Sequence, residues 1–235
     1  MRPTSLWSGA FEFTAKDGTM KLWSNSWTNG DRIPPRYAAG KPDGAGGATF
    51  SDNLNPHLAW SDLPQGTQSV VLVCHDFDVP CRADDVNQVG REVPADLPRV
   101  DFFHWVLVDL PPTPASIGEG DFSRGFTPRG KPGPEVSNSP QRAARHGLND
   151  YTGWFAGDAQ MAGQYFGYDG PFPPFNDSLV HHYVFTLYAV SVPRLPLEGV
   201  FTGVQVREKI AGRVLGEATF SGTYTLNQRL LSGDF

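Results

Sequence analysis

Four runs of apolar, β-branched and aromatic residues constrain the fold of this chain more than any other feature of its sequence. The runs cover residues 69–76, 102–110, 181–190 and 218–226, and their lengths are typical of β-strands. Apart from one segment before the last run, no helical pattern separates them, which favours antiparallel pairing over helical crossovers. The sequence therefore predicts an all-β protein, an antiparallel sandwich with a few short helices.

The pattern within each run predicts where the strand lies in its sheet. The first three runs are apolar on both faces, as in central strands that are covered on two sides. The last run alternates apolar residues with Thr and Ser, so one of its faces meets water.

One helix is expected before the last run. Thr202 and Gln205 have the spacing of a capping box, and Gly216 suits a C-terminal stop. Apolar residues recur at every fourth position between them, at 206, 210 and 214.

Length and composition indicate one domain, residues 1–235, with long loops. Gly 26 and Pro 21 are high counts for a helical protein, and the longest irregular stretches are about 81–101 and 111–147. The second stretch is rich in Arg and Lys, which either cover a surface excursion or steer anions. The net charge of −6 gives no global attraction for nucleic acid or anionic membranes.

No apolar stretch reaches the roughly 20 residues that a membrane span needs, and the N-terminal residues contain no apolar core of a signal peptide. We therefore expect a cytoplasmic protein without an integral membrane segment. Cys74 and Cys81 are too few for a disulfide scaffold or a cysteine-only zinc site.

Two histidines open the third run, and only one of them can face the core. Alternation places His181 and Tyr183 on the more apolar face and His182 on the opposite face. His181 is either a ligand-binding residue beside Tyr183 or a hydrogen-bonded structural histidine at a strand end.

Other polar groups at strand ends follow the same pattern. Asp76 and Asp78 continue the apolar face of the first run, and His104 is expected on the face of Val106 and Val108. Asp76, His104 and His181 therefore predict the rim of a shared pocket.

The residue types of this rim suit anion binding. A carboxylate beside an imidazole fixes its tautomer and favours its protonated form, so His104 or His181 can present N–H donors to a phosphate or carboxylate. Aromatic and proline residues are expected to keep the site dry, namely Trp105, Tyr183, Pro171, Pro173 and Pro174.

Other chemistries rank lower. Two histidines and one carboxylate can hold non-haem iron, but no His-x-Asp pair lies on one strand. The G-x-S-x-G elbow of serine hydrolases is missing, as are the glycine-rich nucleotide-binding loops. We therefore assign no catalytic residue, metal or cofactor.

Several motifs together resemble one known family. In order along the chain, they are "NPHLAWSDLPQGTQSVVLVCHDFDVP", "HWVLVDLPP", "GYDGPFPPFNDSLVHHYVFTLYAV" and "FSGTY". The chain resembles the phosphatidylethanolamine-binding protein family, in its bacterial branch, which is related to Raf kinase inhibitor protein. The resemblance covers about residues 50–225, and "FTAKDGTMKLWSNSWTNGDRIPPRYA" looks like the family's N-terminal segment.

The resemblance implies two antiparallel sheets in a Greek-key sandwich and a small pocket for phosphate-type anions or phospholipid head groups. The family's motif positions fall on Asp76, Asp78, His104, the loop Gly170–Pro174 with Gly170, Pro171 and Pro173, and the strand start His181–Tyr183. In this chain Phe77 replaces the proline between the aspartates, and His182 replaces an arginine.

The function expected from this resemblance is a non-enzymatic binding protein that also regulates a partner protein. One alternative is an inhibitor of a kinase or protease that acts through its loops. Another is a hydrolytic or metal-dependent enzyme that uses His104 and His181. The oligomeric state stays open, with a homodimer as one option.

Overall fold

The computed structural model describes residues 19–136 and 144–231. Two parts of the sequence analysis lie outside this range. They are Arg142, in the Arg- and Lys-rich stretch 111–147 that we call the basic loop, and residues 13–18, the first part of the N-terminal motif.

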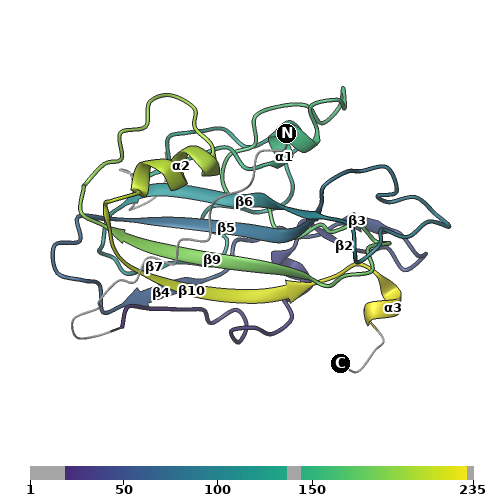
Figure 1. The fold of residues 1–235 in the computed structure, drawn as a ribbon, viewed down its shortest axis with the longest axis horizontal. Helices are drawn as coiled ribbons and strands as arrows, with labels where there is room; N and C mark the ends of the chain where they lie inside the picture. Colours follow the sequence, from purple (N-terminus) through teal and green to yellow (C-terminus); the bar gives the residue numbers. More distant parts are fainter. Residues whose placement is uncertain (1–18, 137–143, 232–235) are drawn as a thin grey trace, which may run out of the picture.

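Two antiparallel sheets form the two main layers of the described chain (Figure 1). The larger sheet has the order β10 (Val214–Tyr224), β9 (His181–Val190), β5 (Ser69–Pro80), β6 (Arg99–Leu110) and β8 (Arg145–His146). The smaller sheet has the order β1 (Lys21–Trp23), β4 (Leu58–Ser61) and β7 (Ser116–Ile117). A hairpin of β2 (Gly40–Pro42) and β3 (Ala48–Phe50) stands apart. The predicted mainly-β class is confirmed, whereas the Greek-key connection stays a prediction.

Helical segments are few and short in the described residues. They are a 3-10 turn η1 (Pro35–Tyr37) and the helices α1 (Tyr151–Trp154), α2 (Gly203–Ile210) and α3 (Gln228–Leu231). None of the helices that the structure describes has the length and apolarity to cross a bilayer.

The large sheet is covered on both faces, as its apolar pattern predicted. A core cluster that includes Leu72 of β5 and Phe185 of β9 packs against Leu58 and Trp60 of the smaller sheet. Residues of the opposite face, such as Val73, pack against α2 instead. Figure 1 shows α2 and the smaller sheet on opposite sides of β5, β6 and β9. The three runs that are apolar on both faces are therefore the interior strands, and the alternating run is the edge strand β10.

The predicted helix begins as expected but ends earlier. The capping box of Thr202 and Gln205 is present, and the helix ends at Ile210. Gly212 then adopts a left-handed conformation with φ of 73°, which turns the chain into β10. Gly216, the expected helix stop, pairs with Ala189 in the large sheet, so that assignment was wrong.

Two basic residues of the basic loop form ion pairs with buried carboxylates, which its composition did not predict. Arg145 lies in β8 and is 2% exposed, and its guanidinium pairs with Asp109 at 2.6 Å. Arg145 also donates hydrogen bonds to the carbonyl oxygens of Leu195 and Leu197. Lys131 pairs with the buried Asp169. Neither cation is therefore free to steer an anion.

We predict that Arg145→Met lowers the free energy of unfolding by about 3 to 5 kcal/mol, because it leaves the Asp109 carboxylate buried without its cation. Urea unfolding followed by circular dichroism measures this loss. Arg82→Met is the matched control, since Arg82 pairs with Asp84 on the surface, where such pairs contribute about 0 to 1 kcal/mol. Equal losses in the two variants would contradict this role of the buried pair.

Candidate functional site

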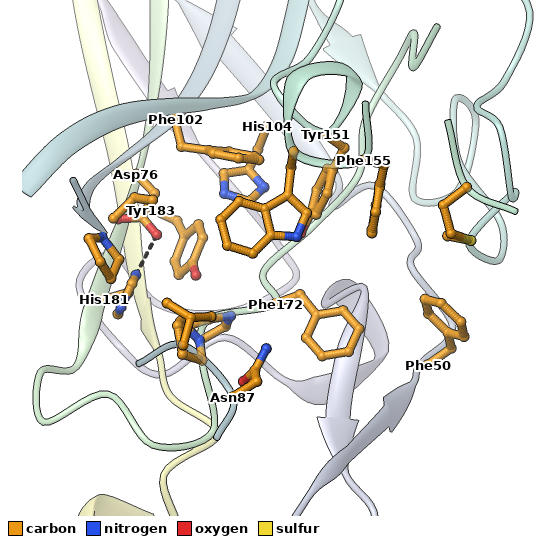
Figure 2. A pocket seen from close by; sticks show the side chains of 17 residues that line it. Phe50, Asp76, Asn87, Phe102, His104, Tyr151, Phe155, Phe172, His181 and Tyr183 are labelled. Atoms are coloured by element: carbon orange, nitrogen blue, oxygen red, sulfur yellow. Dashed lines mark hydrogen bonds and ion pairs between the residues drawn. The ribbon is translucent and has the colours of Figure 1, made fainter. Parts of the chain in front are cut away.

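A cavity of about 260 Å³ opens where the end of β5 and the starts of β6 and β9 meet the loops beyond them. Its walls come from Phe50, Asp76, Val79, Pro80, Val86, Asn87, Phe102, His104, Tyr151, Trp154, Phe155, Met161, Phe172, Pro173, Pro174, His181 and Tyr183. Figure 2 shows that the polar residues Asp76, His104, His181 and Tyr183 gather on one side. The rings of Phe50, Phe155 and Phe172 stand on the other side.

Most of the predicted pocket residues line this cavity. Asp76, His104, Pro173, His181 and Tyr183 all contribute to its wall. They come from β5, β6, β9 and the loop before β9, so side-chain alternation and the family motifs selected residues that the fold does bring together. Their predicted role as ligand contacts stays a prediction.

Asp78 is not part of the cavity wall. The pairing of β5 and β6 shifts register between Asp76 and Val79, so the two aspartates do not share one face. The Asp78 carboxylate instead accepts a hydrogen bond from the backbone N–H of His182 and contacts His182 Nδ1 at 2.8 Å. The His182 ring is exposed and stacks on Phe77, as expected for the face opposite His181.

Gly170 and Pro171 also lie outside the wall and act through their backbone. The N–H of Gly170 donates to Asn53 Oδ1, and the Pro171 carbonyl accepts from the N–H groups of Ala39 and Gly40. A Cβ on Gly170 would lie 2.2 Å from the carbonyl oxygen of Tyr37, so no larger residue fits. These two residues position the loop that carries Phe172 and Pro173.

His104 reaches the cavity through a β-bulge that sequence patterning missed. In the β5–β6 ladder Cys74 pairs with Trp105 and His75 pairs with Phe103, which leaves His104 as the extra residue. The predicted face was therefore wrong, because Val106 and Val108 pack toward α2 on the other side of the sheet. Trp105 belongs to the core between the sheets and not to the pocket wall.

Both nitrogens of His181 are held by carboxylates. Nδ1 lies 2.7 Å from Asp76 Oδ2, and Nε2 lies 3.1 Å from Asp177 Oδ2. Burial lowers the pKa of His181, but the charge of Asp76 and the hydrogen bonds to Asp177 and Asp76 outweigh it and raise this pKa to about 9. The ring is therefore charged at neutral pH, and in this arrangement it has no N–H left for a ligand.

Asp177 connects His181 to a second cation. Arg99 donates from Nη1 to Asp177 Oδ2 at 2.6 Å and from Nη2 to Oδ1 at 3.0 Å. Burial raises the pKa of Asp177, but the hydrogen bonds from His181 and Arg99 overcome this and lower it overall. We call Arg99, Asp177, His181 and Asp76 the charge network. Its two carboxylates and two cations balance, so it places no surplus positive charge at the cavity.

His104 is neutral and has one nitrogen free. Burial lowers its pKa to about 4. Its Nδ1 lies 2.8 Å from the carbonyl oxygen of Asp169, which can only accept, so Nδ1 carries the proton. Nε2 makes no hydrogen bond within the described part of the chain and is an acceptor.

Tyr183 provides the second uncommitted polar group. The residue is 1% exposed, and its hydroxyl has no hydrogen-bond partner among the described residues. Burial raises its pKa well above 10, and the charge of Asp76 adds to this effect, so the hydroxyl stays protonated. A buried hydroxyl without a partner is costly, and a bound ligand would satisfy it.

Sequence reasoning missed most of the aromatic wall and Asp177. Trp154 and Phe155 follow Tyr151 in and after the short helix α1, and Met161 lies in the next loop. No periodicity marks these loop residues. Asp177 precedes His181 by four residues and could have been found only as an acidic neighbour of the histidine.

The described residues offer no group of three His, Cys, Asp or Glu side chains arranged to hold a metal ion. Nor does the cavity wall include Ser, Thr, Cys or Lys among its described residues.

Comparison with known proteins gives one consistent family. The family model of the phosphatidylethanolamine-binding protein matches residues 23–225. A UPF0098 protein of Aquifex aeolicus is 30% identical over 212 residues, which cover 90% of this chain and 92% of that protein. The UPF0098 protein YbhB of Escherichia coli is 27% identical over 206 residues, which cover 88% of this chain and 100% of that protein.

Solved structures agree on the fold. A putative phosphatidylethanolamine-binding protein homolog from Chlamydia trachomatis superposes with a TM-score of 0.58 at 25% identity, covering 88% of this chain and 98% of the other. YbcL of Escherichia coli, described as a member of the mammalian family, gives a TM-score of 0.60 at 20% identity over 88% and 99% of the two chains.

The raised pKa of His181 predicts a pH-dependent stability. The charged ring is favoured in the folded state, so its contribution is complete below the unfolded pKa of about 6.5 and is lost as the pH rises toward 9. We expect the free energy of unfolding to fall across this window by on the order of 3 kcal/mol. Urea unfolding at a series of pH values measures it.

The controls for this prediction are two glutamine variants. His181→Gln should be less stable at pH 6 and should lose most of the pH dependence, whereas His182→Gln should keep it because that ring is exposed. The same pH slope in His181→Gln and the wild-type protein would contradict the assignment.

Proposed function

Because the chain belongs to the phosphatidylethanolamine-binding protein family, we propose that it is a binding protein for a small phosphate-type anion, free or as a phospholipid head group, in the cavity at the end of β5 and the start of β9. The observation that supports this most directly is the buried Tyr183 hydroxyl, which has no described partner and lies beside His104 Nε2 in a largely apolar wall.

These two groups favour an acid that carries a proton. The Tyr183 hydroxyl can donate to a ligand oxygen, and neutral His104 can only accept at Nε2. The monoanion of a phosphate monoester has both an acceptor oxygen and an O–H donor. Since the charge network is balanced, it offers little electrostatic attraction to a second negative charge on the ligand.

We assign binding without turnover. The cavity wall has no described nucleophile of the Ser, Thr, Cys or Lys type, and Asp76 is committed to His181. The proposed site is therefore built to hold a ligand in a fixed orientation. We leave regulation of a partner protein as a prediction of the resemblance.

Tyr183→Phe tests the hydroxyl. We expect it to weaken the binding of methyl phosphate at pH 6 about 10- to 100-fold, the effect of one hydrogen bond to a charged group, and to leave stability unchanged or slightly higher. Titration calorimetry and urea unfolding measure the two quantities. Tyr188→Phe is the control, since Tyr188 lies on the same strand and packs toward the other face. Unchanged affinity in Tyr183→Phe would refute this site.

The pH dependence of binding tests the protonated acid. Methyl phosphate loses its second proton with a pKa of about 6, so affinity should fall about tenfold per pH unit above that value. Because the pKa of His181 is about 9, a histidine-controlled site would instead weaken only near that pH. Methyl sulfate, which carries no proton in this range, should bind weakly throughout. Equal binding of methyl sulfate and methyl phosphate at pH 6 would contradict a role for the ligand proton.

A further inference from the structure

The cavity is larger and more aromatic than a small anion requires. Most of its polar residues sit on the strands β5, β6 and β9, with Asn87 in a loop, whereas most of its rings come from outside the large sheet. Figure 2 shows this division, with Phe50, Phe155 and Phe172 facing the polar side across the cavity. Two chemically different halves predict a ligand with two chemically different parts.

The volume fits an acid joined to one ring. A cavity of about 150 Å³ is enough to hold benzene, and a water occupies about 30 Å³. A phosphate group is the size of a few waters, so a cavity of about 260 Å³ has room for this group and one aromatic ring.

The rings at the mouth are only partly covered. Phe50 is 49% exposed and Trp154 is 45% exposed, although both line the cavity. Within the described part of the chain, the indole of Trp154 stacks on no other ring. A ligand ring would cover apolar surface that water now meets.

The wall already contains the ring geometries that an aromatic ligand would extend. Phe50 meets Phe172 edge-on with centroids 5.9 Å apart, and Tyr151 stacks on Phe155 at 5.8 Å. Aromatic pairs at such distances contribute more stabilising free energy than the burial of their apolar area alone. A flexible alkyl chain would bury area but would not gain these ring contacts.

We propose that the ligand of this cavity is an aryl acid, in which an aromatic ring in the aromatic half is joined to a phosphate-type group held by Tyr183 and His104. This inference rests on the proposed function for its acidic part and adds the ring. Trp154 is the residue expected to distinguish an aryl from an alkyl ligand, because its indole lines the cavity, is partly exposed and stacks on no other described ring.

Three phosphate monoesters at pH 6 test the ring, with affinities from titration calorimetry. We expect phenyl phosphate to bind at least about tenfold more tightly than methyl phosphate. Hexyl phosphate has as many carbon atoms as the phenyl ester but no ring, and it should bind more weakly than phenyl phosphate. Hexyl phosphate binding as tightly as phenyl phosphate would overturn the inference and favour an alkyl or acyl ligand.

A matched pair of tryptophan variants locates the effect. Trp154→Leu should remove most of the advantage of phenyl over methyl phosphate, measured as the ratio of the two affinities in the same variant. Trp23→Leu should change neither affinity, since Trp23 is similarly exposed, at 42%, but lies in β1 away from the cavity. An unchanged phenyl advantage in Trp154→Leu would overturn the assignment of that ring.

The remaining outcomes separate this inference from the proposed function. If methyl phosphate binds and phenyl phosphate binds no more tightly, the aryl ligand is wrong and the anion site stands. If none of the three esters binds, both fail. If phenyl phosphate binds equally well to Tyr183→Phe and the wild-type protein, the acid is not held where we place it, and the proposed function fails while the ring contact stands.

Discussion

The charge network of Arg99, Asp177, His181 and Asp76 is the interaction on which the site depends. It joins the start of β6, the loop before β9, the start of β9 and the end of β5. Arg99 also donates to the carbonyl oxygens of Asp78 and Pro94, so it fixes the loop between β5 and β6 as well. Burying charges is tolerated only when they are paired and hydrogen-bonded, and here each charge has an opposite partner.

This network explains why so few polar groups remain for a ligand. His181 is charged, yet both of its nitrogens are used, so its role is to hold Asp76 and Asp177 in place. On the strands, the Tyr183 hydroxyl and His104 Nε2 remain for a ligand, in a cavity walled mainly by rings and prolines. Such a site selects its ligand by shape and by the position of the ligand's proton more than by net charge. The reason is that a buried donor or acceptor without a partner loses more binding free energy than a screened charge adds.

Much of the fold and part of the site could be predicted from particular residues. Alternation correctly separated His181 from His182, and double-sided apolar runs identified the interior strands. Alternation predicted the wrong sheet face for His104 and Asp78, because a bulge and a register shift change the face on which a side chain lies. Such irregularities depend on the partner strand and leave no periodic signal in their own segment.

The sequence by itself determined the strands, the apolar faces and the polar groups at the strand ends, because these follow from local periodicity and residue chemistry. Tertiary structure alone decided which polar groups were already satisfied and which were free. Asp177 reached His181, Asp169 fixed the tautomer of His104, and Tyr183 was left without a partner. It also brought Trp154 and Phe172 from separate loops to one wall. Contacts between distant segments depend on how the layers pack, and no single stretch of sequence encodes them.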